Sequence, residues 1–154
     1  MKTLRQILES KSGLLATVSP DDSVLKALQV MAEHNVGAVL VIDQEQLLGI
    51  FSERDYARKM ILRGKSSKDT RVRDIMSGKV LYVTPKQTVD ECMAIMTERH
   101  FRHLPVLDDD QKVIGIVSIG DVVKEMICEQ QFIIEQLGQY IAGSAIAAPL
   151  TPPG

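Results

Sequence analysis

The chain has 154 residues, of which 25% are charged and 45% hydrophobic, and its formal net charge is −2. This length fits one compact domain that buries about two-thirds of its unfolded surface. The charge shows no global basic excess, so nucleic-acid binding is not favoured. No stretch reaches the roughly 18 apolar residues of a membrane span, and residues 1–7 lack the apolar core of a signal peptide. We therefore expect a cytoplasmic protein without a membrane partner.

The first half of the chain reads as strand, helix, strand, strand, helix. An N-terminal helical segment (1–13) precedes an extended stretch at 15–18, which Pro20 ends. Asp22 or Ser23 can cap a helix that runs to about residue 35. The apolar run 38–42, a polar turn at 43–46 and the returning strand 47–51 lead to a second helix, predicted from 52 to about 63.

The second half repeats this order after a basic connector at 64–78. Strands are expected at 80–83, 104–107 and 113–117, with a helix at 88–100 between the first two. A last helix begins at 118 and continues to 143, and a tail at 144–154 is expected to be disordered. The predicted domain organisation is therefore a first repeat at 14–63, a second repeat at 79–128 and a helical extension at 129–143.

The two halves are related by an internal repeat. At an offset of 65 residues, Val18 and Pro20 match Val83 and Pro85, and after one extra turn residue Gly49 and Asp55 match Gly115 and Asp121. Strands that are apolar on successive residues need cover on both faces. The fold class is therefore predicted as α/β, with two pseudo-symmetric β-α-β-β-α repeats that close one shared core.

A hydroxyl and a carboxylate recur where a strand meets a helix in each repeat. They are Ser52 and Asp55 in the first copy, and Ser118 and Asp121 in the second. Free backbone N–H groups and the positive end of a helix dipole favour anions there. The same residues can instead be helix caps, because serine at the N-cap with an acidic residue three positions later is stabilising. Capping and ligand binding can coexist.

The cysteines and histidines indicate no metal centre. Cys92 and Cys128 lie 36 residues apart without a CxxC pattern or a nearby histidine cluster, so neither zinc nor a disulfide framework is expected. Cys92 falls on the apolar stripe of a predicted helix and is expected in the core. His34 and His100 lie at predicted helix ends. We found no catalytic triad, P-loop or dinucleotide-binding signature.

The last helix carries an apolar pattern beyond the end of the repeat, from Val122 to Ile141. Such a stripe needs cover. We expect that cover from the N-terminal residues Leu4, Ile7 and Leu8, or from a second copy of the chain, and a homodimer is therefore predicted.

The paired Gly-x-x-Ser-x-x-Asp motifs, each after an apolar strand, resemble those of a tandem pair of cystathionine-β-synthase (CBS) domains over about residues 10–128. The second copy, residues 103–108 with 115–121, is the closer match, while the first has Leu40 where the second has Pro105. The resemblance implies a stand-alone regulatory module that binds AMP, ADP, ATP, NAD(H) or S-adenosylmethionine between the repeats. It implies no catalysis and no catalytic cofactor.

The resemblance also implies two clefts, each built from both repeats. One would contain Ser118, Gly120 and Asp121 together with Ala16, Val36, Gly37 and Ala38. The other would contain Ser52, Arg54 and Asp55 together with Leu81, Phe101, Arg102 and His103. A carboxylate can accept hydrogen bonds from ribose hydroxyls, and cationic side chains favour phosphate. The second of these clefts is therefore expected to prefer a more highly charged nucleotide or a dinucleotide.

The predicted function is an adenine-nucleotide sensor that reports ligand state to an unidentified regulated protein through a population shift. Two alternatives stay open at this point. One is an enzyme that acts on a bound nucleotide, although no nucleophile or base stands out. The other is a dimeric scaffold or nucleic-acid-associated module, which would use the basic run from Arg58 to Arg73. This run lies within the stretch 52–79, where nine Lys or Arg face four Asp or Glu.

Overall fold

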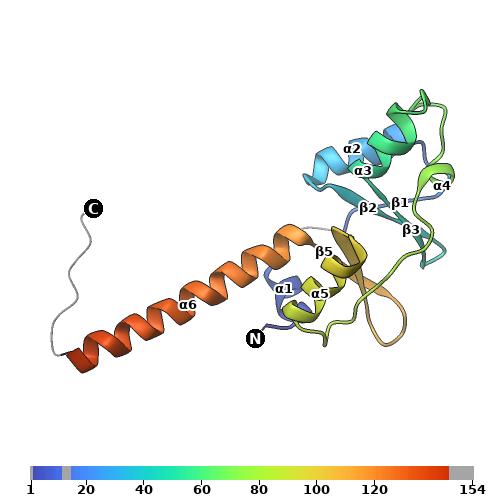
Figure 1. Cartoon of the computed structure of the whole chain (residues 1–154). Coiled ribbons are helices and arrows are strands. Elements are labelled where there is room, and N and C mark those ends of the chain that lie inside the picture. The colour runs from blue at the N-terminus through green and yellow to red at the C-terminus, as the bar shows by residue number, and fades with distance from the viewer. Residues whose placement is uncertain (1, 12–14, 146–154) are drawn as a thin grey trace.

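Two sheets with their helices form the body of the molecule, and one long helix projects from it (Figure 1). The computed structural model describes residues 2–11 and 15–145. All but the first two residues of the predicted tail at 144–154 therefore lie outside the described residues.

The first repeat forms a three-stranded sheet in the order β1-β2-β3. Strand β1 (Thr17–Val18) is parallel to β2 (Ala38–Asp43), which pairs antiparallel with β3 (Gln46–Ser52). Between β1 and β2 runs α2 (Val24–His34), whose N-cap is Ser23. Gln44 and Glu45 both have positive φ, at 49° and 66°. This is the conformation that a tight two-residue hairpin requires.

The helix after β3 differs from the single α-helix predicted for 52–63. It begins as α3 (Glu53–Asp55) and continues as a π-helical segment, η1 (Tyr56–Ile61), whose turns are wider than those of an α-helix. In this arrangement Met60 is fully buried, while the Lys59 amine reaches back to Asp55 and to the Ile75 carbonyl. The segment thus connects the core to the residues around Asp55.

The second repeat has only two full strands, β4 (His103–Leu107) and β5 (Val113–Ser118), with α5 (Val89–Arg99) before them. The predicted strand at 80–83 is reduced to a single bridge between Val83 and Val106. In the first repeat the Leu40 amide donates to the Ala16 carbonyl at 3.1 Å. Pro105 stands at the equivalent position and has no N–H to donate, which explains the shortened strand.

Two separate clusters of buried side chains replace the one shared core that the sequence predicted. The first includes Val39, Phe51 and Met60, and the second includes Cys92, Met96 and Leu104. Each sheet therefore packs mainly against its own repeat's helices. Ala38 and Leu40 alternate along β2 with members of the first cluster and are also buried, at 2% and 0% exposure, so this strand is covered on both faces.

A short helix before each repeat packs on the other repeat. Helix α1 (Leu4–Ser10) buries Leu4 and Ile7 in the second cluster, and α4 (Val72–Ile75) buries Val72 and Ile75 in the first. The backbone bonds match as well: Leu4 and Arg5 donate to the carbonyls of Gln87 and Pro85, and Val72 and Arg73 donate to those of Asp22 and Pro20. The N-terminal segment and part of the connector are thus equivalent elements.

The repeated glycines allow helix α1 and the residues that follow α4 to lie close against the strands. A Cβ at Gly49 would lie 2.8 Å from Met76 Sδ and 2.8 Å from the Ser77 carbonyl oxygen. A Cβ at Gly115 would lie 2.5 Å from Leu8 Cδ2. All three distances are too short for a Cβ contact, so the two glycines have a packing role of their own.

Helix α6 (Ile119–Ala145) packs on the body only through its first turns. Val122 is buried in the second cluster and Met126 packs against it, beside α1. Lys2 forms an ion pair with Glu125 at 3.0 Å. The N-terminal segment therefore covers the base of the helix, as predicted, while residues 130–141 extend away from the body and are exposed (Figure 1).

Candidate functional site

Ser52 and Asp55 form a reciprocal cap at the start of α3. The Asp55 amide donates to Ser52 Oγ at 3.3 Å, and the Ser52 amide donates to Asp55 Oδ2 at 3.0 Å. The other carboxylate oxygen, Oδ1, accepts from Ser77 Oγ at 3.2 Å and lies 3.3 Å from Lys59 Nζ. The capping interpretation thus holds here, and Asp55 also joins the connector to the helix.

Ser118 and Asp121 repeat the cap, but a different cation meets the carboxylate. The Ser118 amide donates to Asp121 Oδ2 at 2.8 Å, and the Asp121 amide donates to Ser118 Oγ at 3.1 Å. Lys11 Nζ lies 2.8 Å from the same Oδ2 and donates to the Ile116 carbonyl at 2.9 Å. Burial by itself would raise the pKa of Asp121, yet the bonds from Lys11 and Ser118 hold that pKa below its usual range.

The helix starts offer fewer free amides than the sequence indicated. The Glu53 amide donates to the Gly37 carbonyl at 3.0 Å, and the Ile119 amide donates to the Arg102 carbonyl at 2.8 Å. In each repeat, this bond and the serine cap together occupy two of the first three backbone amides of the helix. Any anion that binds here must therefore rely chiefly on side chains.

An open cavity of about 720 Å³ lies at the Ser52 and Asp55 site, between the two repeats. Its volume is within the range of small-molecule sites. Residues of the first repeat and connector line one side: Gly37, Ile50, Ser52, Glu53, Arg54, Asp55, Arg58, Lys59 and Ser77. The run His100, Phe101, Arg102 and His103 of the second repeat lines the other. Four Lys or Arg side chains face two carboxylates, so the cavity is cationic.

His103 lies where the two repeats meet. A Cβ on Gly37 would be 3.6 Å from His103 Nε2 and 3.7 Å from Glu53 Oε2, which are ordinary contact distances, so Gly37 lies directly beside the imidazole. Burial lowers the pKa of His103 and outweighs the opposing influence of Asp121 and Glu53. The imidazole is therefore mainly neutral at neutral pH, and it can donate and accept hydrogen bonds but does not supply the positive charge expected from sequence.

The remaining predicted site residues have other surroundings. Ala16 is buried in the first cluster, where Val36 packs against it, and Ala38 is buried in β2. Leu81 packs against the second cluster and is not among the residues that line the cavity. Gly37, expected beside Ser118 and Asp121, is among the residues that line the Ser52 and Asp55 cavity. Gly120 lies close to Ser118, because a Cβ on this glycine would be 3.6 Å from Ser118 Oγ.

Sequence reasoning missed six of the cavity's residues, which are Ile50, Glu53, Arg58, Lys59, Ser77 and His100. Helical spacing could have identified two of them, because Arg58 and Lys59 follow Arg54 and Asp55 by four positions. Ser77 could not be found in this way, since only the path of the connector brings it to Asp55.

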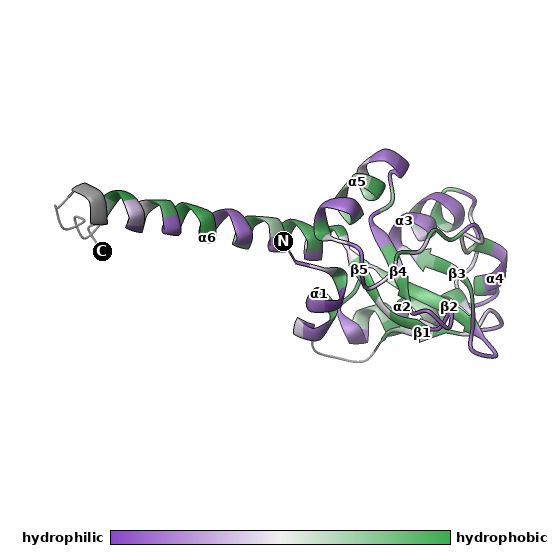
Figure 2. Cartoon of the chain, turned by 90° about the horizontal axis from the view of Figure 1, so that it is seen from below, coloured by the Kyte–Doolittle hydropathy of each residue, from purple (hydrophilic) through white to green (hydrophobic). Residues whose placement is uncertain are grey.

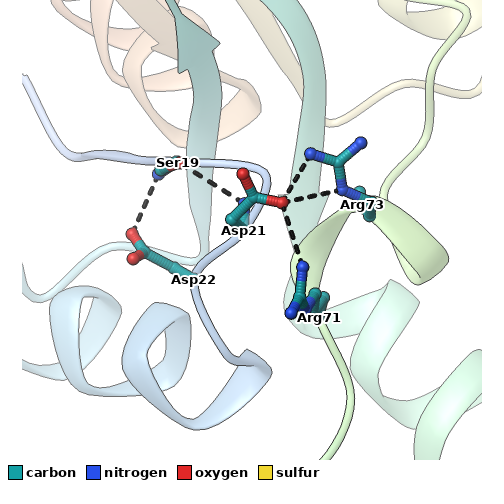
Figure 3. A network of polar contacts seen from close by, with 5 residues as sticks. All are labelled: Ser19, Asp21, Asp22, Arg71 and Arg73. Atoms are coloured by element: carbon teal, nitrogen blue, oxygen red, sulfur yellow. Dashed lines mark hydrogen bonds and ion pairs between the residues drawn. The ribbon is translucent and has the colours of Figure 1, made fainter.

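The basic stretch 52–79 divides into two groups. Arg54, Arg58 and Lys59 line the cavity. Arg71 and Arg73 instead pair with Asp21 in the loop before α2, where Arg73 Nε donates to Asp21 Oδ1 at 3.0 Å (Figure 3). The arginines at the end of the stretch thus hold the connector to the first repeat, and this use does not favour the nucleic-acid alternative.

Within residues 2–11 and 15–145, no group of three or more His, Cys, Asp or Glu side chains could hold a metal ion. Over the same residues, no helix is long and apolar enough to cross a membrane.

Comparison with known proteins identifies the class. The family model for the CBS domain matches residues 15–62 and again residues 72–127. The chain therefore belongs to the CBS domain family, and it contains a tandem pair of these domains.

Similar proteins are known from plants and bacteria. The chain is 41% identical to the mitochondrial CBS domain-containing protein CBSX3 of Arabidopsis thaliana, over 92% of this chain and 72% of that protein. The structure of a putative signal-transduction protein with CBS domains from Burkholderia ambifaria has a TM-score of 0.80 and 52% identity, and covers 84% of this chain and 96% of its own. CBSX2, solved in complex with AMP, has a TM-score of 0.66 and 28% identity over 84% of this chain and 99% of its own.

Proposed function

We propose that this chain is an adenine-nucleotide-binding regulatory module whose main ligand site is the cavity around Ser52 and Asp55. The cationic cavity between the repeats is the observation that carries the proposal. Its volume suits a nucleotide, and its lining combines carboxylates, cations and the aromatic ring of Phe101. The AMP bound by CBSX2, a structural neighbour, supports an adenine ligand.

The lining divides naturally into parts that suit the parts of a nucleotide. Arg54, Arg58 and Arg102 would meet the phosphates, because guanidinium groups bind phosphate oxygens with paired hydrogen bonds. Asp55 would accept from ribose hydroxyls in exchange for the bond from Ser77 or Lys59. Neutral His103 and the backbone near Gly37 would contact the base.

The charge of the cavity favours ligands with more than one phosphate. Three guanidinium groups and Lys59 surround it, while AMP offers a single phosphate. We therefore expect ADP, ATP or NAD(H) to bind more tightly than AMP or S-adenosylmethionine. The Ser118 and Asp121 cleft has Gly120 in place of Arg54, and Lys11 already neutralises its carboxylate. While Lys11 holds Asp121, we expect that cleft to bind an AMP-like ligand too weakly for calorimetry to resolve a second binding event.

Ligand binding between the repeats would favour one arrangement of the two sheets over another. A partner protein would then read this arrangement, so the role is regulatory and not catalytic. The cytoplasmic location and the homodimer stay predictions, and the Arabidopsis relative is named as mitochondrial.

Calorimetry on three proteins tests the proposal: the wild-type chain, Asp55→Ala and Asp121→Ala. Each is titrated with AMP, ADP, ATP, NAD and S-adenosylmethionine. We expect Asp55→Ala to lose most of the affinity for the preferred ligand, and Asp121→Ala to keep it. Equal losses for every ligand in both variants, or no binding to the wild-type chain, would contradict the proposal.

A further inference from the structure

From Ile127 outward, α6 exposes large apolar side chains to water. Ile127 is 50% exposed, Ile134 67% and Leu137 56%. In Figure 2 hydrophobic residues recur from turn to turn along the projecting helix. A helix that leaves the body and carries such residues needs a partner for them.

These residues follow a heptad pattern. Val123, Ile127, Gln130, Ile134 and Leu137, which we call the α6 seam, are separated by alternating steps of four and three residues. This spacing keeps one stripe facing a second helix along a shared axis, as in coiled coils. Isoleucine at positions 127 and 134, with leucine at 137, is the combination that favours two helices.

The residues beside the seam fit a copy of the same helix. On one side lie Met126, Ile133 and Tyr140, and on the other Lys124, Gln131 and Gly138. Only one of these six side chains is charged, so two copies meet without like charges along the flanks. A Cβ on Gly138 would meet nothing within 4 Å, so that flank is open to close approach.

The neighbouring face of α6 is used differently. Phe132 and Ile133 line a hollow with Lys2, Glu125, Cys128 and Glu129 at the base of the helix. We leave Phe132 out of the seam, whereas Ile133 borders both this hollow and the seam.

The exposed area approaches what a dimer needs. Six side chains, those of Val123, Ile127, Ile133, Ile134, Leu137 and Tyr140, are between 40% and 75% exposed. If each side chain buries a surface of on the order of 100 Å², the six together bury about 600 Å² per copy. A standard interface buries about 800 Å² per partner. The methylene groups of Lys124, Gln130 and Gln131 can add to this area.

We infer that the α6 seam pairs with the α6 seam of a second copy, as a two-helix coiled coil in which the two Gln130 side chains meet. Gln130 interrupts an otherwise apolar stripe, and its amide can both donate to and accept from the same amide of the second copy, although burying a polar group there costs stability relative to an apolar residue. The inference does not depend on nucleotide binding, because α6 contributes nothing to the lining of the Ser52 and Asp55 cavity.

Sedimentation velocity across the micromolar range tests the pairing with the full chain. We expect the wild-type chain to sediment as a species of twice its 17.1 kDa mass. The double variant Ile134→Glu/Leu137→Glu places charges in the seam and should be monomeric. The matched control Gln136→Glu/Gln139→Glu adds the same two charges outside the seam and should stay dimeric.

Two further measurements keep the test specific. Gln130→Leu removes the polar residue and should move dimer dissociation to lower concentration. Nucleotide titration should give the same affinity in the monomeric variant as in wild type, so a failure of the seam is distinguished from a failure of the nucleotide site. The inference is overturned if the wild-type chain is monomeric or if the seam variant is dimeric. It is equally overturned if the control dissociates as readily as the seam variant, or if Gln130→Leu leaves the dimer unchanged.

Discussion

Lys11 Nζ lies 2.8 Å from Asp121 Oδ2, and this ion pair joins residues that are 110 positions apart in the chain. The equivalent carboxylate, Asp55, pairs instead with Lys59 on its own helix. The two capped carboxylates are therefore neutralised from different directions. Lys11 follows α1 and crosses to the second repeat, whereas Lys59 leaves the cavity beside it open.

Removing the Lys11 amine should free the second carboxylate for a ligand. We expect Lys11→Met to add a second, weaker nucleotide-binding event in calorimetry, because Asp121 then has no cation beside it. The ion pair is partly exposed, so the free energy of unfolding should fall by no more than about 1 kcal/mol. Lys2→Met is the matched control, since Lys2 pairs with Glu125 away from both clefts. Two binding events in wild type, or one in Lys11→Met, would contradict this role.

Stability should fall on mild acidification because of His103. Burial lowers the pKa of its imidazole in the folded state, so below about pH 6.5 the unfolded chain binds a proton that the folded chain does not. Stability is therefore complete above pH 6.5 and is lost as the pH falls toward the folded pKa. Denaturant titrations of His103→Gln should show a smaller loss in this window. His34→Gln, outside the cavity lining, should behave as wild type, and an equal slope in all three proteins would refute the assignment.

The two repeated glycines should differ in what their replacement disturbs. Gly49→Ala forces the connector backbone at Ser77 away from β3, so both stability and nucleotide affinity should fall. Gly115→Ala meets the flexible end of Leu8, so stability should fall while affinity at the Ser52 and Asp55 cavity is kept. Each substitution should cost about 1–3 kcal/mol of unfolding free energy, the usual effect of overpacking. Denaturant unfolding and calorimetry on the same samples provide the check, and an affinity loss shared by both variants would argue against this distinction.

The two cysteines should differ sharply in reactivity. Cys128 is exposed, whereas Cys92 is buried and its burial raises the pKa of the thiol to about 11. The thiolate is the reactive form. One equivalent of a thiol reagent should therefore react with the native protein, and a second only in denaturant. Cys128→Ser should abolish the native reaction, and rapid reaction of that variant without denaturant would show that Cys92 is accessible.

Much of the fold could be predicted from the spacing of apolar residues and from the residue types that begin and end helices and strands. Ser23 and Thr88 cap the two helices that the apolar spacing predicted, and Asn35 and His100 end them in the left-handed conformation. The strands β2 to β5 differ from the predicted ranges by no more than one residue at either end. Local patterns suffice for these elements because their signals lie within a few residues of one another.

The missed features depend on contacts between distant segments. The shortened strand at Val83 follows from Pro105, which lies 22 positions later in the chain, in β4. The approach of Lys11 to Asp121 and of Ser77 to Asp55 follows from the paths of α1 and α4 across the repeats. The neutral state of His103 reflects its burial at the junction, which no local pattern reports.

The exchanged positions of α1 and α4 have a consequence for how this chain can be divided. A fragment that ends before α4 keeps α1, whose apolar side chains Leu4 and Ile7 fit only the missing half, and it leaves the first cluster without Val72 and Ile75. A fragment that begins at α4 has the reverse defect. A single cut therefore gives each half the other's helix, and complementary fragments should become folded only when they are mixed.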